Sequence, residues 1–244
     1  MKRILAGPNA VTEALRAAPK QIEMILLADG LQENTANAIS DLARKSGTSL
    51  ETVSRTTLDA MAKGLNHQGI LAITGEYPFV DLDRLLELAG QREHPLLLVL
   101  DQIQDPGNLG AIVRSACSLG AAGVIITKDR SATMTSAAVR SSAGASELTR
   151  IARVSNLVQC LDALKNGGYR IYGAAGEATT PISRIDWTGK SVLVLGNEGK
   201  GLRRLTRENC DTLFAIPMAG GFESLNVSAA AAICLYEATR NKNV

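Results

Sequence analysis

Three segments of the sequence combine glycine with polar side chains that could hold a small ligand and act on it. They are LDQIQDPGNLGAIVRSA at 100–116, LVLGNEGKGLRRLT at 193–206 and IPMAGGFESLN at 216–226. Glycine lets a backbone approach a ligand closely. The three glycines around Glu198 therefore favour a ligand-binding loop, with a merely flexible loop as the alternative.

The other two segments also have a purely structural interpretation. Asn108 follows an Asp-Pro-Gly turn and could cap a helix, but this leaves Arg114, six positions further along, without a role. Ser224 and Asn226 could cap the last helix. The alanines at 229–232 could provide tight packing or allow close approach of a ligand. The three segments together indicate a ligand site more specifically than any one of them.

The elements that must position these side chains are those of a parallel sheet. Nearly continuous apolar runs occur at 95–101, 123–127, 169–175, 191–198 and 212–218. Such runs, separated by stretches with helical spacing, predict an α/β fold whose parallel sheet is covered on both faces. Ligands of such sheets bind beyond the carboxyl ends of the strands, which is where the three segments lie.

Residues 1–75 predict a separate small α/β domain. Helical spacing at 8–17, 34–47 and 57–64 alternates with strand-like runs at 22–28, 48–54 and 69–75. Residues 76–95 are acidic and bracketed by Pro78 and Pro95, with a short helix expected at 81–89. We therefore predict a domain at 1–75, a linker at 76–95 and a larger domain at 96–244.

The composition excludes several classes of protein. The chain has 244 residues, of which 45% are hydrophobic and 20% charged, as in folded globular proteins. It contains no apolar run long enough for a membrane span and no signal peptide, so we expect a cytoplasmic protein without membrane contact. Four widely spaced cysteines argue against a zinc site or a disulfide framework. We expect Cys117 and Cys234 to be small buried residues.

Charge gives a mild indication of a polyanionic partner. The net charge is only +2, but a local basic cluster follows the second segment and consists of Lys200, Arg203, Arg204 and Arg207. Such a cluster can bind nucleic acid, or it can be an ordinary solvated helix face.

A nucleotide-dependent oxidoreductase is disfavoured because the glycine spacing after the strand at 191–196 does not match the dinucleotide fingerprint.

In this order, the three segments resemble the signature motifs of the SpoU family of RNA 2′-O-ribose methyltransferases, part of the SPOUT superfamily. The resemblance covers most of 96–244. GPNAVTEAL and NHQGILA are similar to the ends of the substrate-binding domain, related to ribosomal protein L30e, that precedes the catalytic domain in many members. The resemblance implies a parallel sheet with a C-terminal trefoil knot, a homodimer, S-adenosylmethionine as methyl donor and no metal.

The resemblance also assigns roles to residues. It implies catalytic positions at Asn108, Arg114, Glu198, Ser224 and Asn226. It implies that the donor is bound by Leu195, Gly196, Ile216, Met218 and Leu225. Because a guanidinium stays protonated, we expect Arg114 to anchor a phosphate and not to act as the base. Glu198 would position Arg114 or the loops, Ser224 and Asn226 would fix the substrate and the donor loop, and the basic cluster would hold the RNA backbone.

The resemblance implies a guanosine in 23S ribosomal RNA as the target, because KDRSA at 128–132, LTREN at 205–209 and IPMAG at 216–220 are similar to the ribosomal enzymes of the family. A departure occurs at 221–223, where Gly-Phe-Glu replaces smaller and more neutral residues. A transfer RNA methyltransferase and a non-catalytic RNA-binding factor of ribosome assembly are the alternatives.

Overall fold

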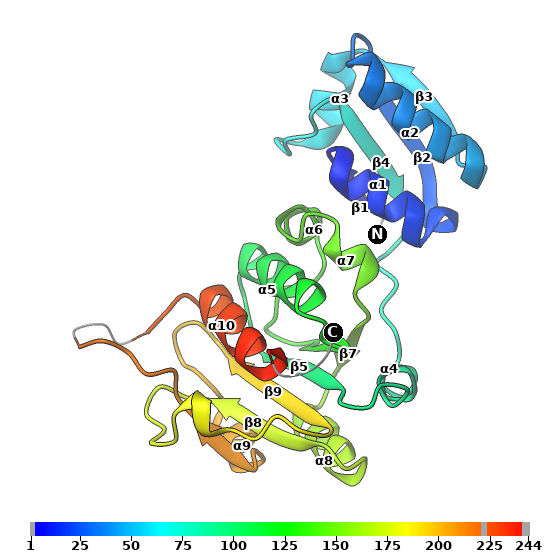
Figure 1. The fold of residues 1–244 in the computed structure, drawn as a ribbon. Coiled ribbons are helices and arrows are strands. Elements are labelled where there is room, and N and C mark those ends of the chain that lie inside the picture. Colours follow the sequence, from blue (N-terminus) through cyan, green and yellow to red (C-terminus); the bar gives the residue numbers. More distant parts are fainter. Residues whose placement is uncertain (1–2, 221–223, 241–244) are drawn as a thin grey trace.

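The computed structural model describes residues 3–220 and 224–240, which form two α/β units (Figure 1). The first unit has a four-stranded sheet in the order β1-β4-β2-β3. Its strands are β1 (Arg3–Ala6), β2 (Ile22–Ala28), β3 (Leu50–Val53) and β4 (Ile70–Thr74). Strand β4 runs antiparallel to β1 and β2, whereas β3 is parallel to β2. We call residues 3–74 the N-terminal unit.

Two layers of helices cover the sheet of the N-terminal unit. Its helices are α1 (Pro8–Ala17), α2 (Glu33–Ser46) and α3 (Arg55–Ala62), with a 3-10 turn at Pro19–Gln21. Helices α1 and α2 bury Val11 and Ile39 in one core cluster, and α3 buries Leu58 in another. Helix α2 ends at Gly47, whose φ of 70° is left-handed, and Ser54 caps α3 by accepting a hydrogen bond from the Thr57 backbone N–H at 3.2 Å.

The second unit is built on six parallel strands in the order β10-β8-β9-β5-β6-β7, as the apolar runs predicted. The strands are β5 (Leu96–Asp101), β6 (Gly123–Thr127), β7 (Ile151–Val154), β8 (Arg170–Ala174), β9 (Ser191–Gly196) and β10 (Thr212–Phe214). Successive residues of β5 enter opposite cores, with Leu98 in one cluster and Leu97 and Val99 in the other. Both faces of the sheet are therefore buried.

Helices lie on both faces of this sheet (Figure 1). Helices α5 (Pro106–Ser118) and α10 (Val227–Thr239) cover one face, and α4 (Leu82–Ala89) and α8 (Leu157–Asn166) cover the other. The remaining helices are α6 (Ser136–Ser141), α7 (Ala145–Leu148), α9 (Arg204–Glu208) and the 3-10 turn Ile182–Arg184. Among the described residues, no helix is both long and apolar enough to cross a membrane.

The segment between the two units contributes to the second one. Helix α4 packs its buried Leu85 and Ala89 against the core that contains Leu97 and Ile125. Val80 forms a parallel bridge with Ala152 and so lies beside β7. The expected helix at 81–89 is therefore present, and it packs on the sheet. The linker at 76–95, as a boundary between domains, stays a prediction.

The structure corrects two expectations about local structure and adds two strands that the sequence patterns did not predict. The strand predicted for 212–218 ends at Phe214, because Ala215 pairs with Pro181 instead and Pro217 has no N–H for a ladder. Edge strands β1 and β7 were not predicted. Cys234 is fully buried, but Cys117 is only half-buried, so its predicted burial was wrong. Burial raises the pKa of the Cys234 thiol to about 12.

Candidate active site

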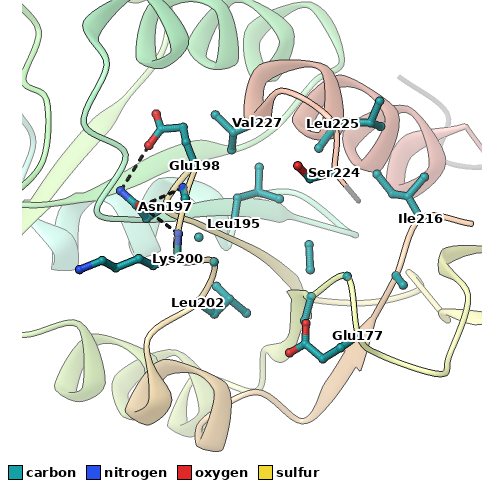
Figure 2. Close-up of a pocket in the computed structure, with 18 of the residues that line it drawn as sticks. Glu177, Leu195, Asn197, Glu198, Lys200, Leu202, Ile216, Ser224, Leu225 and Val227 are labelled. Atoms are coloured by element: carbon teal, nitrogen blue, oxygen red, sulfur yellow. Dashed lines mark hydrogen bonds between the residues drawn. The ribbon is translucent and has the colours of Figure 1, made fainter. Parts of the chain in front are cut away.

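The ends of β8, β9 and β10 surround a cavity of about 480 Å³ (Figure 2). Its walls are mostly small or apolar, with Ala174, Phe214 and Val227 among them. The five residues assigned to donor binding all line it: Leu195, Gly196, Ile216, Met218 and Leu225. Glu198 and Ser224 line it as well. A cavity of this size and lining fits a small ligand with both apolar and polar parts.

Gly196 has no room for a side chain because its own loop folds back over it. A Cβ at this position would lie 2.2 Å from the carbonyl carbon of Gly201. Two backbone hydrogen bonds between Asn197 and Gly201, at 3.0 and 2.9 Å, close the loop. Gly201 has a left-handed φ of 65°. The fold of this loop therefore itself requires glycine at 196 and favours it at 201.

Asn197 organises this loop, although it is not among the residues that the motifs predicted for the site. Its side-chain oxygen accepts hydrogen bonds from the N–H groups of Gly199 and Lys200 at 3.0 and 3.2 Å. Its amide nitrogen donates to the carbonyl of Gln102 at 2.9 Å, and to Glu198 at 3.3 Å (Figure 2). Asn197 thereby ties the second segment to the first. The signal was an asparagine next to the strand-ending glycine, a position where asparagine forms turns with its own backbone.

Three of the predicted catalytic side chains form one hydrogen-bonded chain. The Asn108 amide nitrogen donates to Glu198 at 3.1 Å, and the Asn226 amide nitrogen donates to the Asn108 oxygen at 3.1 Å. The Gln104 backbone N–H also points to Glu198, at 3.5 Å. Glu198 therefore contacts the loop at 102–105 and Asn108. Both roles expected for Glu198, positioning Arg114 or the loops, stay predictions.

The residue that caps helix α5 is not Asn108, as one structural interpretation of the sequence had it. The cap of α5 is Asp105, whose carboxylate accepts the Asn108 backbone N–H at 2.6 Å. Asn108 is thus not the cap, and its side chain is available for Glu198 and Asn226. Asn226 does cap α10, because its oxygen accepts the Ser228 N–H at 2.8 Å. Asn226 therefore combines the structural role with a contact to Asn108.

Arg114 and Ser224 lie outside this hydrogen-bonded chain. Ser224 is exposed and lines the cavity. Arg114 is exposed on α5. Within residues 3–220 and 224–240, Arg114 forms no hydrogen bond through its side chain and no ion pair. Its guanidinium is consequently available to a ligand. Residues 221–223, where the sequence departs from the family pattern, lie outside the described residues.

Most of the basic cluster is already paired with carboxylates. The Arg203 side chain binds the fully buried Asp101 at 2.6 Å, and the Arg203 N–H donates to the same carboxylate at 3.1 Å. Arg204 pairs with Glu208 at 2.6 Å. Arg207 pairs with Glu177. Lys200 has no ion-pair partner in the described part of the chain, so it is the member of the cluster with its charge uncompensated.

The rim of the cavity carries charge of both signs. Lys200 and Arg207 line it together with Glu177 and Glu198. Hydrogen bonds from its own backbone and from Arg207 hold the pKa of Glu177 below its usual value. Glu177 is therefore ionised at neutral pH.

The described residues contain no group of three or more His, Cys, Asp or Glu side chains arranged to hold a metal ion.

Two family models of RNA methyltransferases together match nearly the whole chain. The model described as the SpoU rRNA methylase family matches residues 95–236, and that of RNA 2′-O ribose methyltransferase substrate binding matches residues 4–80. The chain belongs to the SpoU rRNA methylase family. The family predicted from the three segments is confirmed.

Individual relatives are similar over almost their full length. The chain is 40% identical to the 23S rRNA (guanosine-2′-O-)-methyltransferase RlmB of Vibrio cholerae, over 98% of this chain and 97% of that protein. It is 43% identical to the protein of that name from Coxiella burnetii, over 97% of this chain and 94% of the other.

Solved structures are also similar along the whole chain. The crystal structure of the SpoU methyltransferase AviRb from Streptomyces viridochromogenes is 29% identical, with a TM-score of 0.84 over 99% of this chain and 90% of that chain. A second structure of AviRb, in complex with the cofactor AdoMet, is 27% identical, with the same TM-score and coverage. Both units of the present chain therefore have counterparts there.

Proposed function

We propose that this protein transfers a methyl group from S-adenosylmethionine to the ribose 2′-hydroxyl of a guanosine in 23S ribosomal RNA. The observation that carries the proposal is the cavity at the ends of β8, β9 and β10, which is lined by every residue assigned to donor binding. Near-full-length relatives named for this reaction on 23S RNA support the substrate. A structural relative in complex with AdoMet supports the donor.

The cavity suits S-adenosylmethionine in size and chemistry. About 480 Å³ is within the range of small-ligand sites. Leu195, Ile216 and Leu225 offer apolar contact to the adenine, and the main chain around Gly196 offers hydrogen-bonding groups. The carboxylates of Glu177 and Glu198 suit the positive groups of the donor. Once bound, the donor supplies an already activated methyl group.

The chain Asn226–Asn108–Glu198 orients the acceptor side of the site. Each amide is held by its partner at 3.1 Å, so the polar groups are fixed before the substrate arrives. Ser224 contacts the substrate from the rim of the cavity. Arg114, uncommitted on α5, binds a phosphate of the target nucleotide through its guanidinium.

RNA binding uses the N-terminal unit together with cations near the cavity. The substrate-binding family model matches residues 4–80, which supports recognition of RNA by the N-terminal unit. Lys200 contacts the RNA backbone, and exposed faces of Arg203, Arg204 and Arg207 add to the positive field. Because Arg203, Arg204 and Arg207 are already ion-paired, they contribute less than their formal charge.

The proposal includes a homodimer and the trefoil knot of the family. Helix α10 presents large apolar side chains to solvent, with Ile233 41% and Tyr236 60% exposed. A second copy of the chain covers this face in the dimer. Leu225 and Met218, which line the cavity, are also 37% and 40% exposed. The resemblance to the family implies that the loops at 196–201 and 216–226 are threaded together in this knot to hold the donor. As a modifier of ribosomal RNA, the protein acts in the cytoplasm.

The proposal is tested by methyl transfer from labelled S-adenosylmethionine. The substrates are unmodified 23S ribosomal RNA and, in parallel, unmodified transfer RNA. We expect label in the ribosomal RNA alone and a donor that binds in calorimetry. Label in transfer RNA alone would keep the chemistry and overturn the target. The absence of label in both, together with the absence of donor binding, would leave an RNA-binding factor of ribosome assembly.

A further inference from the structure

A buried ion pair joins the N-terminal unit to helix α7 of the second unit. Arg3 in β1 binds Glu147 in α7 at 3.1 Å, and the two side chains are only 6% and 3% exposed. The Arg3 Nε donates to the Gly75 carbonyl at 3.2 Å. The second terminal nitrogen of Arg3, Nη2, is buried without a hydrogen-bond partner among the described residues. This pair connects residues 144 positions apart.

Tyr77 completes the contact from the segment that leaves the N-terminal unit. Its ring centroid lies 5.0 Å from the Arg3 guanidinium carbon. Its hydroxyl donates to the Ser146 carbonyl at 2.6 Å and lies 3.3 Å from the Thr149 carbonyl. Burial raises the pKa of Tyr77 far above its usual range, so the hydroxyl remains a donor at all ordinary pH values.

The surrounding surfaces fit closely. A Cβ at Gly144, the residue before α7, would lie 2.9 Å from Cγ of Glu13 in α1. Buried side chains of the N-terminal unit, such as Val11 and Leu15, belong to the same core cluster as Val139 of α6. Figure 1 shows α6 and α7 between the N-terminal unit and the rest of the second unit. The two units are thus packed as one body at this point.

The energetics of such a pair indicate a role in geometry. Desolvation of both charges offsets most of their attraction, so a buried ion pair contributes little net stability compared with apolar residues. Removing one partner, however, leaves an unpaired buried charge and opens the contact. The whole-chain similarity to AviRb, which includes both units, supports a single arrangement. A pair with these properties penalises every other orientation of the two units.

We propose that Arg3, Glu147 and Tyr77 lock the N-terminal unit in one orientation relative to the methyl-donor cavity, so that they act as positioning residues for the RNA. This inference rests on the proposed function. RNA held by the N-terminal unit then presents its target nucleotide to the cavity at a fixed distance. A fixed orientation strengthens RNA binding because the two units do not have to be oriented when the RNA arrives.

The test compares Glu147→Gln with the matched surface control Asp41→Asn, which breaks the exposed pair between Asp41 and Arg44. Hydrogen exchange reports on the contact without any activity. We expect faster exchange at 76–80 and 145–149 in Glu147→Gln, with β5 and β9 unchanged. In methyl transfer, the KM for RNA rises about tenfold, while kcat and donor binding stay at the wild-type level. Asp41→Asn behaves as wild type in both assays.

Two further variants decide the result if Glu147→Gln fails to fold. Tyr77→Phe removes the hydroxyl without burying an unpaired charge, and it should produce a smaller change of the same kind. Arg3→Gln combined with Glu147→Gln leaves no buried charge and should recover much of the RNA affinity.

Unchanged exchange in Glu147→Gln and Tyr77→Phe would overturn the lock. Faster exchange with an unchanged KM would overturn its role in presenting RNA. If the wild-type protein methylates no RNA, the proposed function fails, and this is visible independently of the exchange data.

Discussion

At the scale of single residues, the site depends on contacts between side chains that are distant in sequence. Asn108 is 90 positions from Glu198 and 118 from Asn226, yet it contacts both. The sequence motifs selected these three residues, but they could not show that the residues bind one another, because that depends on how three loops pack. The motifs also left Asn197 unselected, since its function is to fold the loop.

Replacement of Asn108 tests the hydrogen-bonded chain. Asn108→Asp cannot donate to Glu198 and places a second carboxylate about 3.1 Å from it. We expect methyl transfer to fall about 100-fold, the usual loss when a positioned hydrogen-bond donor is removed from an active site. Rates are measured with labelled donor and 23S RNA, with the exposed Asn166→Asp on α8 as control. Activity equal to that of the control would exclude a functional role for the hydrogen bonds that join Asn226, Asn108 and Glu198.

Replacement of Arg114 tests phosphate binding. Lysine keeps the positive charge but cannot form a bidentate contact with a phosphate. Arg114→Lys should therefore lower kcat/KM for RNA about tenfold, with donor affinity unchanged in calorimetry. Arg44→Lys, at an exposed position of α2, is the control. Full turnover by Arg114→Lys would argue against bidentate binding.

At the scale of elements, the loop at 197–201 connects the sheet to the site. Continuous apolar runs were sufficient to predict β5, β6, β8 and β9, because these strands are buried on both faces and their pattern is clear. Strands β1 and β7 are short edge strands with an exposed or charged residue, so their pattern was too weak. The sequence also could not show why residue 196 must be glycine. The reason is that the backbone of its own loop folds back over it and leaves no space for a side chain.

Two glycines of this loop provide a matched pair of variants. Gly196→Ala would place a methyl group 2.2 Å from the Gly201 backbone, so the loop must move. Gly199→Ala meets nothing closer than 3.8 Å. We expect Gly196→Ala to weaken donor binding at least about tenfold in calorimetry, because the cavity wall shifts, and Gly199→Ala to have a small effect. Equal affinities for the two variants would contradict the structural role given to Gly196.

At the scale of the whole molecule, we propose that the N-terminal unit recognises RNA and that the second unit carries out the chemistry. The pattern of strands predicted a small and a large α/β domain; the structure has two separate sheets, and the domain boundaries stay predictions. The packing of the two units through Arg3 and Glu147 was not predicted, because a contact between residues 144 positions apart leaves no local pattern. The dimer that we propose would cover the exposed apolar face of α10 with a second copy of the chain, which no local sequence pattern shows either.

The proposed dimer is tested at Tyr236. Tyr236→Glu places a charge at the centre of the exposed apolar face of α10. We expect dissociation into monomers in sedimentation equilibrium, because a buried unpaired charge opposes association. Leu205→Glu changes a similarly exposed apolar residue on α9 and should leave the mass unchanged. A wild-type protein that is monomeric at all concentrations would contradict the dimer.

The most direct test of the central claim is the nucleoside content of 23S ribosomal RNA from cells that lack this protein. Mass spectrometry of the digested RNA measures 2′-O-methylguanosine in those cells and in cells complemented with the wild-type chain or with Asn108→Asp. The account predicts that 2′-O-methylguanosine decreases without the protein, returns with the wild-type chain and stays low with the variant. An unchanged level of 2′-O-methylguanosine in the 23S RNA of the deletion strain would contradict it.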